Sequence, residues 1–164
     1  MQYFCHDLRA LRAQFRPLAR LQSLWPEDQY MMVLRGLADL GGRAVTARDG
    51  LRLAGSAMFM PALKMGGIAA TPGLKSAVER AGIAPGAVLC LTNIFVDPAY
   101  RGRGVSVAME ARAAELARVA GFTHSVALLY ASREILAWFE RRPDKISAGI
   151  EDAAGDPVYF LPLV

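Results

Sequence analysis

The chain has 164 residues, the size of one domain that can bury a core without disulfides or a structural metal. Hydrophobic residues make up 54% and charged residues 21%, a balance that excludes an intrinsically disordered chain. The net charge of +4 comes from basic residues scattered along the whole length, so we expect a solvated basic surface and no nucleic-acid partner.

The cysteines and the N-terminal residues carry no signal for metal binding or export. Cys5 and Cys90 stand far apart and outside any Cys/His cluster, so no metal site is expected. Residues 1–15 mix charged with apolar side chains, and no stretch of about 18 uncharged apolar residues follows. We therefore expect a single cytoplasmic domain over residues 1–164 with no membrane partner.

Hydrophobic spacing predicts two helices in the N-terminal part of the chain. Apolar residues recur at intervals of three and four between Asp7 and Leu24, which is typical of an amphipathic helix that Pro17 kinks or splits. A second helix is expected to start at Pro26, where a proline is followed by two acidic residues, and to end before Gly41.

A β-hairpin and a long segment between two strands come next. Residues 43–48 and 51–60 read as two strands around the dipeptide Asp49-Gly50, which supplies the positive φ that a tight hairpin needs. Prolines and glycines recur throughout residues 61–86, and a short helix is expected at 75–81. Long segments of this kind between strands often line substrate sites.

The next three elements are a strand, a glycine-rich turn and a helix. Residues 87–96 are nearly all apolar, which predicts a central strand buried on both faces. The turn 97–103 leads into an alanine-rich helical pattern over 104–120, and Gly121 ends it.

Three strands and one helix are predicted for the rest of the chain. Residues 125–130 form a short apolar strand, and Ser132 stands at the N-cap of a helix that Pro143 ends. Two weaker strands are expected at 145–150 and 157–163.

The glycine-rich turn is the motif that carries chemistry. A buried strand that runs into glycines and opens a helix directs backbone N–H groups and the positive end of the helix dipole at one point. Gly102 and Gly104 allow phosphate oxygens to approach closely, and Arg101 and Arg103 add charged donors, so a pyrophosphate fits there. Neither the Walker pattern nor a dinucleotide fingerprint is present.

Residues 93–106, Asn-Ile-Phe-Val-Asp-Pro-Ala-Tyr-Arg-Gly-Arg-Gly-Val-Ser, resemble the acyl-CoA signature of the GNAT superfamily of N-acyltransferases. The order of elements agrees with that family over most of residues 7–163. The resemblance implies an α/β (α+β) fold with a mixed, mostly antiparallel central sheet, a V-shaped splay and about four flanking helices. It implies acetyl-CoA or another acyl-CoA as co-substrate, no metal, and a small-molecule, peptide or protein amine as acceptor.

The resemblance also implies which residues hold the acyl-CoA. The pantetheine arm would pair with main chain near Phe95 and Val96, and the pyrophosphate would lie against the glycine-rich turn. The residues assigned to the cofactor are Phe95, Val96, Arg101, Gly102, Arg103, Gly104, Val105, Ser106 and Ser132. Ser106 replaces the usual small Gly or Ala, and its hydroxyl can itself donate to phosphate.

The catalytic groups depart from the family pattern. Phe139 falls where many members have a tyrosine that protonates the leaving thiolate, and phenylalanine has no proton to give. Tyr130 is the replacement acid that we expect, with a tyrosine packed on Trp138 as the alternative. Asn93 stands where some members place a carboxylate, and it either polarises the acyl carbonyl or is a satisfied buried amide.

Several questions stay open at this level. Trp25 and Tyr30 either line the acceptor pocket or fill the core. A non-catalytic acyl-CoA-binding module is the alternative to an N-acetyltransferase, because the usual acid and carboxylate are missing. The sequence identifies neither the acceptor, the acyl chain length nor the general base, and it leaves a homodimer open.

Overall fold

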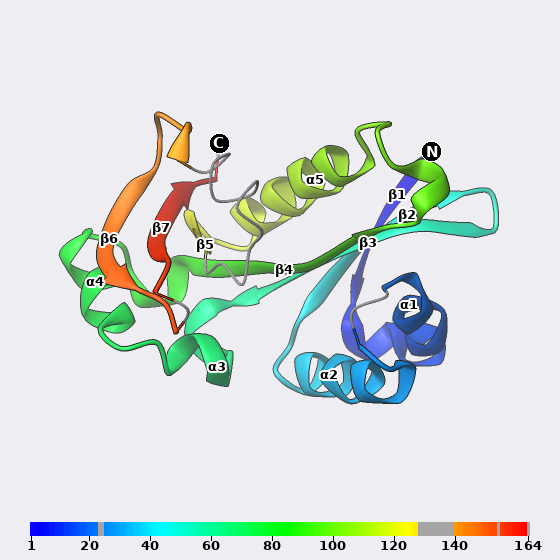
Figure 1. The fold of residues 1–164 in the computed structure, drawn as a ribbon, viewed down its shortest axis with the longest axis horizontal. Coiled ribbons are helices and arrows are strands. Elements are labelled where there is room, and N and C mark those ends of the chain that lie inside the picture. The colour runs from blue at the N-terminus through cyan, green and yellow to red at the C-terminus, as the bar shows by residue number, and fades with distance from the viewer. Residues whose placement is uncertain (23–24, 128–139, 154, 164) are drawn as a thin grey trace. The chain divides into compact units, whose positions relative to one another are not determined.

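The computed structural model describes residues 1–22, 25–127, 140–153 and 155–163 (Figure 1). The described strands are β1 (Gln2–Asp7), β2 (Arg43–Asp49), β3 (Arg52–Pro61), β4 (Val88–Val96), β5 (His124–Ala127), β6 (Ile146–Glu151) and β7 (Pro157–Pro162). The described α-helices are α1 (Phe15–Leu21), α2 (Glu27–Asp39), α3 (Gly66–Ala69), α4 (Leu74–Arg80) and α5 (Val105–Val119). Short 3-10 helices are η1 (Leu8–Gln14), η2 (Ala62–Lys64), η3 (Pro85–Ala87) and η4 (Pro98–Tyr100).

The strands follow the order β1-β2-β3-β4-β5-β7-β6 in one sheet. The pair β4–β5 is parallel, whereas β1–β2, β2–β3, β5–β7 and β6–β7 are antiparallel. The expected mixed, mostly antiparallel sheet with flanking helices is therefore confirmed. None of the described helices is long and apolar enough to cross a membrane.

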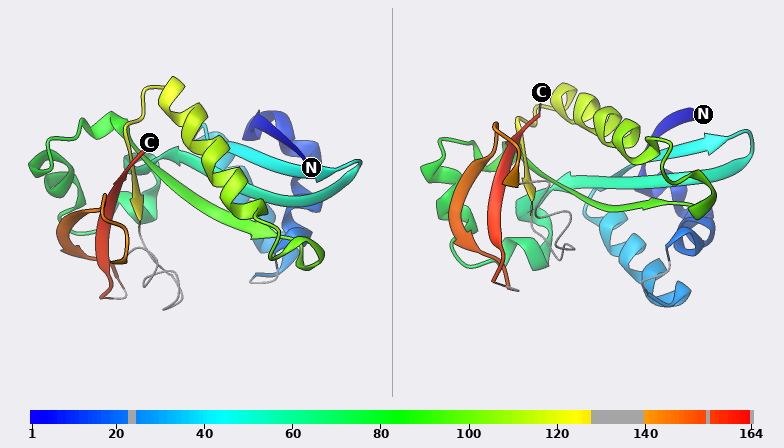
Figure 2. Two further views of the ribbon diagram at one scale, coloured as in Figure 1. Left: turned by 90° about the horizontal axis from the view of Figure 1, so that it is seen from above. Right: turned by 45° about the horizontal axis from the view of Figure 1, so that its top comes forward.

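The chain divides into two compact units, and each is described by itself. Unit 1 comprises Met1–Met60 and Leu91–Leu116, and unit 2 comprises Pro61–Cys90 and Ala117–Val164. In unit 1, helices α1 and α2 lie on one face of the strands and α5 lies on the other (Figures 1 and 2).

Strand β1 was not predicted from the sequence. It pairs with β2 in a continuous register from Gln2↔Arg48 to Asp7↔Arg43. The predicted helix over 7–24 is instead the 3-10 helix η1 followed by α1. Pro17 lies in the first turn of α1, where a missing N–H breaks no helical hydrogen bond, so the split falls before the proline and not at it.

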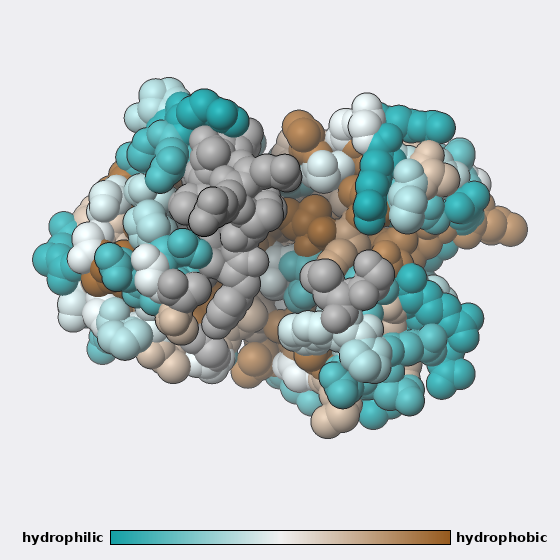
Figure 3. All heavy atoms as spheres, in the orientation of Figure 1, coloured by the Kyte–Doolittle hydropathy of each residue, from teal (hydrophilic) through white to brown (hydrophobic). Residues whose placement is uncertain are grey.

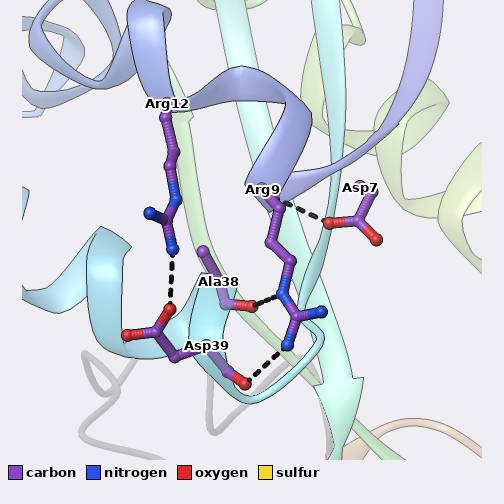
Figure 4. Close-up of polar contacts among 5 residues, drawn as sticks. All are labelled: Asp7, Arg9, Arg12, Ala38 and Asp39. Carbon is purple, nitrogen blue, oxygen red and sulfur yellow. Dashed lines mark hydrogen bonds and ion pairs between the residues drawn. The ribbon is translucent and has the colours of Figure 1, made fainter.

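The end of α2 is closed by the main chain and by a side chain from η1 (Figure 4). Gly41, at φ 80°, donates its N–H to Ala38 O at 3.0 Å, as expected of a glycine that ends a helix. Arg9 adds two bonds, from Nε to Ala38 O and from Nη2 to Asp39 O, both at 3.1 Å. Arg12 Nη2 reaches the Asp39 carboxylate at 2.8 Å. Arg9 therefore adds a charged donor to two carbonyls at the end of α2, and Arg12 pairs with a carboxylate there.

The outer surface of α1 and α2 is polar. Arg16 and Arg20 form ion pairs with Glu27 at 3.0 and 2.9 Å, and all three side chains are at least one-third exposed. Figure 3 shows mostly hydrophilic residues over these helices. The opposite, apolar side of the helices covers the sheet, in agreement with the predicted amphipathic spacing.

The predicted hairpin is confirmed as β2 and β3. Gly50 at the turn has φ 57°, which is the left-handed backbone that the Asp-Gly pair predicts. The neighbouring Leu51 is 98% exposed at the tip. The hairpin therefore extends its tip into solvent while its strands pass through the core of unit 1.

Unit 2 has its own core. Its buried residues are Ala62, Ile68, Leu74, Ala77, Val78, Ile83, Val88, Cys90, Val126, Ala148, Val158 and Phe160. Helix α4, close to the predicted 75–81, packs on β6, where Arg80 Nη2 donates to Ala148 O at 3.2 Å. Strands β6 and β7 confirm the predictions for 145–150 and 157–163.

Candidate functional site

Strand β4 leaves regular geometry at Asn93. This residue has φ 52°, and no other described residue except glycine has a positive φ. Asparagine tolerates the left-handed region better than most residues, and strained backbone of this kind clusters at functional sites. The strand is buried at Val88–Cys90, but Ile94 is 39% exposed. The expectation of a strand buried on both faces is therefore wrong for its second half.

Asp97 fixes the turn that follows β4. Its N–H donates to Ala54 O of β3 at 2.9 Å. Its carboxylate accepts from Ala99 N at 2.9 Å and from Arg52 Nη2 at 3.0 Å. The bond from the Ala99 N–H and the bond from Arg52 lower the pKa of Asp97, so this carboxylate is ionised at neutral pH.

Tyr100 ties the same turn to the β2–β3 hairpin. Its side chain is nearly buried, and its hydroxyl donates to Asp49 Oδ2 at 3.1 Å. The guanidinium carbons of Arg52 and Arg103 lie 5.3 and 5.6 Å from the centre of its ring, which is cation–π distance. Burial is the main cause that raises the pKa of Tyr100, followed by its bond to Asp49. The hydroxyl is therefore a neutral donor that holds the turn in place.

Both glycines of the turn adopt a left-handed backbone. Gly102 and Gly104 each have φ 72°, and a Cβ on either would meet nothing within 4 Å. The fold thus requires glycine here for its backbone conformation and not for packing. Helix α5 begins at Val105, and its first bond runs from Ala108 N to Gly104 O at 3.0 Å. The N–H groups before Ala108 have no partner within the helix, so they are available to an anion.

The side chains around this turn divide between core and surface. Val105 is 3% exposed and contributes to the site only through its main chain, whereas Ser106 is exposed. Arg101 and Arg103 are exposed, and Arg101 Nε donates to Val96 O at 3.2 Å. The turn therefore combines backbone N–H groups, two guanidinium groups and the positive end of a 15-residue helix.

The structure brings most of the predicted cofactor residues together in unit 1. Phe95 and Val96 end β4, and residues 101–106 form the turn and the start of α5 directly after it. Tyr130, Ser132 and Phe139 lie outside the described residues. Within the described part of the chain, no group of three or more His, Cys, Asp or Glu side chains is placed to bind a metal.

Sequence reasoning missed two residues that support the turn. Asp49 and Arg52 lie 51 and 45 positions before their partners Tyr100 and Asp97, and only the folding of the hairpin brings them together. The dipeptide Asp49-Gly50 predicted the hairpin itself, but a turn signal does not show what the hairpin contacts.

Residues 7–141 match the model of the acetyltransferase (GNAT) family, which is most of the chain. The chain therefore belongs to the GNAT family of acetyltransferases. A search of curated proteins found no match.

Solved structures of this family have the same fold. A protein from Desulfovibrio desulfuricans assigned to the GNAT family is 17% identical, with 99% of both chains covered and a TM-score of 0.61. An aminoglycoside 6'-N-acetyltransferase in complex with coenzyme A is 16% identical, with coverage of 100% and 98% and a TM-score of 0.62. The PaiA N-acetyltransferase from Thermoplasma acidophilum, also with coenzyme A, is 10% identical, with 99% of both chains covered and a TM-score of 0.57.

Proposed function

We propose that this protein is an N-acetyltransferase that transfers the acetyl group of acetyl-CoA to a primary amine. The observation that carries the proposal is the turn after β4, where two left-handed glycines lead into the N-terminus of α5. Membership of the acetyltransferase family supports the reaction class. The coenzyme A complexes among the similar structures support the donor.

The chain's own groups fit the charge and shape of this donor. A pyrophosphate is an anion with several acceptor oxygens, and the N–H groups at the start of α5 are donors that point out of the helix. Arg101 and Arg103 add charge without steric hindrance, because glycine occupies positions 102 and 104. Main chain at Phe95 and Val96 would hold the pantetheine arm.

The transfer needs positioning more than covalent help from the protein. The nitrogen of a neutral amine attacks the thioester carbon, the C–N bond forms, and the C–S bond breaks. The amine loses a proton to a base or to water, and the departing thiolate takes one up. Tyr130 is proposed as the acid that protonates sulfur, and Asn93 as the group that polarises the acyl carbonyl.

Binding of coenzyme A tests the role of the turn. Gly104→Val should abolish binding measured by calorimetry, because a side chain forced at φ 72° distorts the N–H groups at the start of α5. Gly82→Val is the matched control, since Gly82 has φ 70°, also has free space around its Cβ position, and belongs to unit 2 and not to the turn. Arg103→Ala should weaken binding less than Gly104→Val, because it removes one solvated donor.

Both glycine variants should lose similar stability, but only Gly104→Val should lose coenzyme A. Equal affinities for the two variants would mean that the turn does not hold phosphate. Thiol release from acetyl-CoA with a panel of amines then tests the reaction. A protein that binds coenzyme A tightly but releases thiol no faster than buffer would be a non-catalytic acyl-CoA-binding module.

A further inference from the structure

Two buried hydroxyl groups in unit 1 have no hydrogen-bond partner among the described residues. They are Tyr30 Oη and Ser56 Oγ, and the two side chains are 1% and 0% exposed. Folded proteins pair nearly all such groups, because a buried hydroxyl without a partner has lost its bonds to water. Each exception therefore points to a partner other than the described residues, and a bound ligand is one such partner.

Tyr30 is placed by two other aromatic rings. It projects from α2, and its ring meets the Phe95 ring edge-on, with the centroids 5.7 Å apart and the planes at 81°. Trp25 meets it on another side, at 6.0 Å and 68°, and is 50% exposed. The three rings run from the surface of unit 1 to the segment of β4 that is proposed to hold the acyl donor.

The hydroxyl of Ser56 lies on the face of the sheet that α2 covers. A Cβ on the preceding residue, Gly55, would point at Met109 of α5, with 2.9 Å to Met109 Cε and 3.0 Å to Phe95 O. Because side chains alternate along a strand, Ser56 faces the opposite side, which α2 covers. Ser56 Oγ thus lies on the side of the sheet that α2 covers, next to a residue that approaches Phe95 O, while the Tyr30 ring contacts the Phe95 ring.

The hydroxyl of Tyr30 is suited to binding and not to proton abstraction. Burial raises the pKa of Tyr30 well above its usual range, so the group stays protonated at any pH at which the protein is assayed. A neutral phenol offers one donor and acceptor lone pairs. It can accept an N–H of an uncharged amine, and it adds no titration of its own to the reaction.

We propose that Tyr30 is a positioning residue for the acceptor, whose hydroxyl oxygen accepts a hydrogen bond from the primary amine beside Phe95. This inference rests on the proposed N-acetyltransferase function and adds to it the group that binds the nucleophile. The bond orients the nitrogen lone pair toward the thioester carbon while the aromatic rings of Trp25 and Phe95 exclude water. Transfer then starts from an amine that is already aligned.

Tyr30→Phe tests the proposal, with the amine that gives the fastest thiol release by the native protein as substrate. The variant should raise KM for the amine and lower kcat/KM by about 2- to 12-fold, the range of one neutral hydrogen bond, with KM for acetyl-CoA unchanged. Its pH–rate profile should keep the native shape. Its Tm should stay the same or rise, because the change removes a buried hydroxyl for which the described residues provide no partner.

Two tyrosines serve as controls. Tyr100→Phe removes a hydroxyl that does have a partner, Asp49, so its Tm should fall. Tyr3→Phe, on the edge strand β1, should leave both Tm and the kinetics for the amine unchanged. The three variants share one chemical change and differ only in what the hydroxyl touches.

The outcomes separate this inference from the function on which it rests. No amine-dependent thiol release by the native protein would overturn both. An active native protein with Tyr30→Phe within twofold of it for the amine would overturn the inference alone. A fall in Tm for Tyr30→Phe would show a structural partner, and an altered pH profile would show proton transfer. Either result would also overturn it.

Discussion

Glycine-to-alanine substitutions at two positions of unit 1 should change stability in opposite directions. Gly36 lies on the exposed side of α2, and a Cβ added there would meet nothing within 4 Å. Alanine keeps the helical backbone and restricts the unfolded chain, so Gly36→Ala should raise the free energy of unfolding by about 0.4–1 kcal/mol.

Gly55 in β3 has no such space. An added Cβ would lie 2.9 Å from Met109 Cε, 3.0 Å from Phe95 O and 3.2 Å from Met109 Sδ. The end of the Met109 side chain can shift, although the residue is fully buried, but the carbonyl oxygen of Phe95 moves only with β4. Overpacking of this kind costs about 1–3 kcal/mol. An entropy gain of about 0.5 kcal/mol from alanine offsets part of this cost and leaves a net loss of about 0.5–2.5 kcal/mol.

Urea denaturation measures both changes, since a shift of the midpoint at constant slope is a change in stability. The midpoint should rise for Gly36→Ala and fall for Gly55→Ala. Coenzyme A affinity adds a second comparison, because only Gly55→Ala displaces main chain that is proposed to hold the pantetheine arm. Midpoints that move in the same direction, or a Gly55→Ala protein as stable as the native one, would refute the argument that close packing of α5 on β3 and β4 requires this glycine.

Two further predictions concern the helix end and the pH dependence. Arg9→Ala should lower the free energy of unfolding by about 1 kcal/mol, because two carbonyls at the end of α2 lose a charged donor, and Arg12→Ala should have little effect, because its ion pair is exposed. Equal urea midpoints for these two variants would contradict the helix-closing role of Arg9. Burial lowers the pKa of both His6 and His124, so the unfolded chain binds protons more readily than the fold below about pH 6.5, and stability should fall as the pH is lowered from 7 to 5.5. In the double variant His6→Asn/His124→Asn, the free energy of unfolding from denaturation curves should change less between pH 7 and 5.5 than in the native protein. An equal change in both proteins would mean that other groups cause the pH dependence.

Local signals in the sequence predicted the elements whose boundaries depend on nearby residues. Pro26 and Gly41 bracket α2, and Gly50 turns the hairpin, because a fixed φ and a positive φ are properties of the residue itself. The same reasoning located the turn at Gly102 and Gly104 and the start of α5. The geometry of the proposed anion site could thus be predicted, since a strand, a glycine turn and a helix N-terminus are contiguous in the chain.

Prediction from the apolar pattern failed where the burial of a residue depends on which other element packs against it. Val119 continues the apolar spacing of α5 but is 85% exposed. The second half of β4 reads as a buried strand, yet Ile94 is 39% exposed. Periodicity shows which residues share a face of an element, but it does not show how far a neighbouring element extends over that face.

Only the tertiary structure decided what joins the separate segments of unit 1. The strand β1 has little apolar alternation of its own and is ordered through its register with β2. The bond between Tyr100 and Asp49 spans 51 positions, and the contact of Tyr30 with Phe95 joins α2 to β4. The sequence determined the glycine turn, because a backbone preference is a property of the residue itself. The tertiary structure determined how that turn is held, because contacts between distant segments exist only in the folded chain.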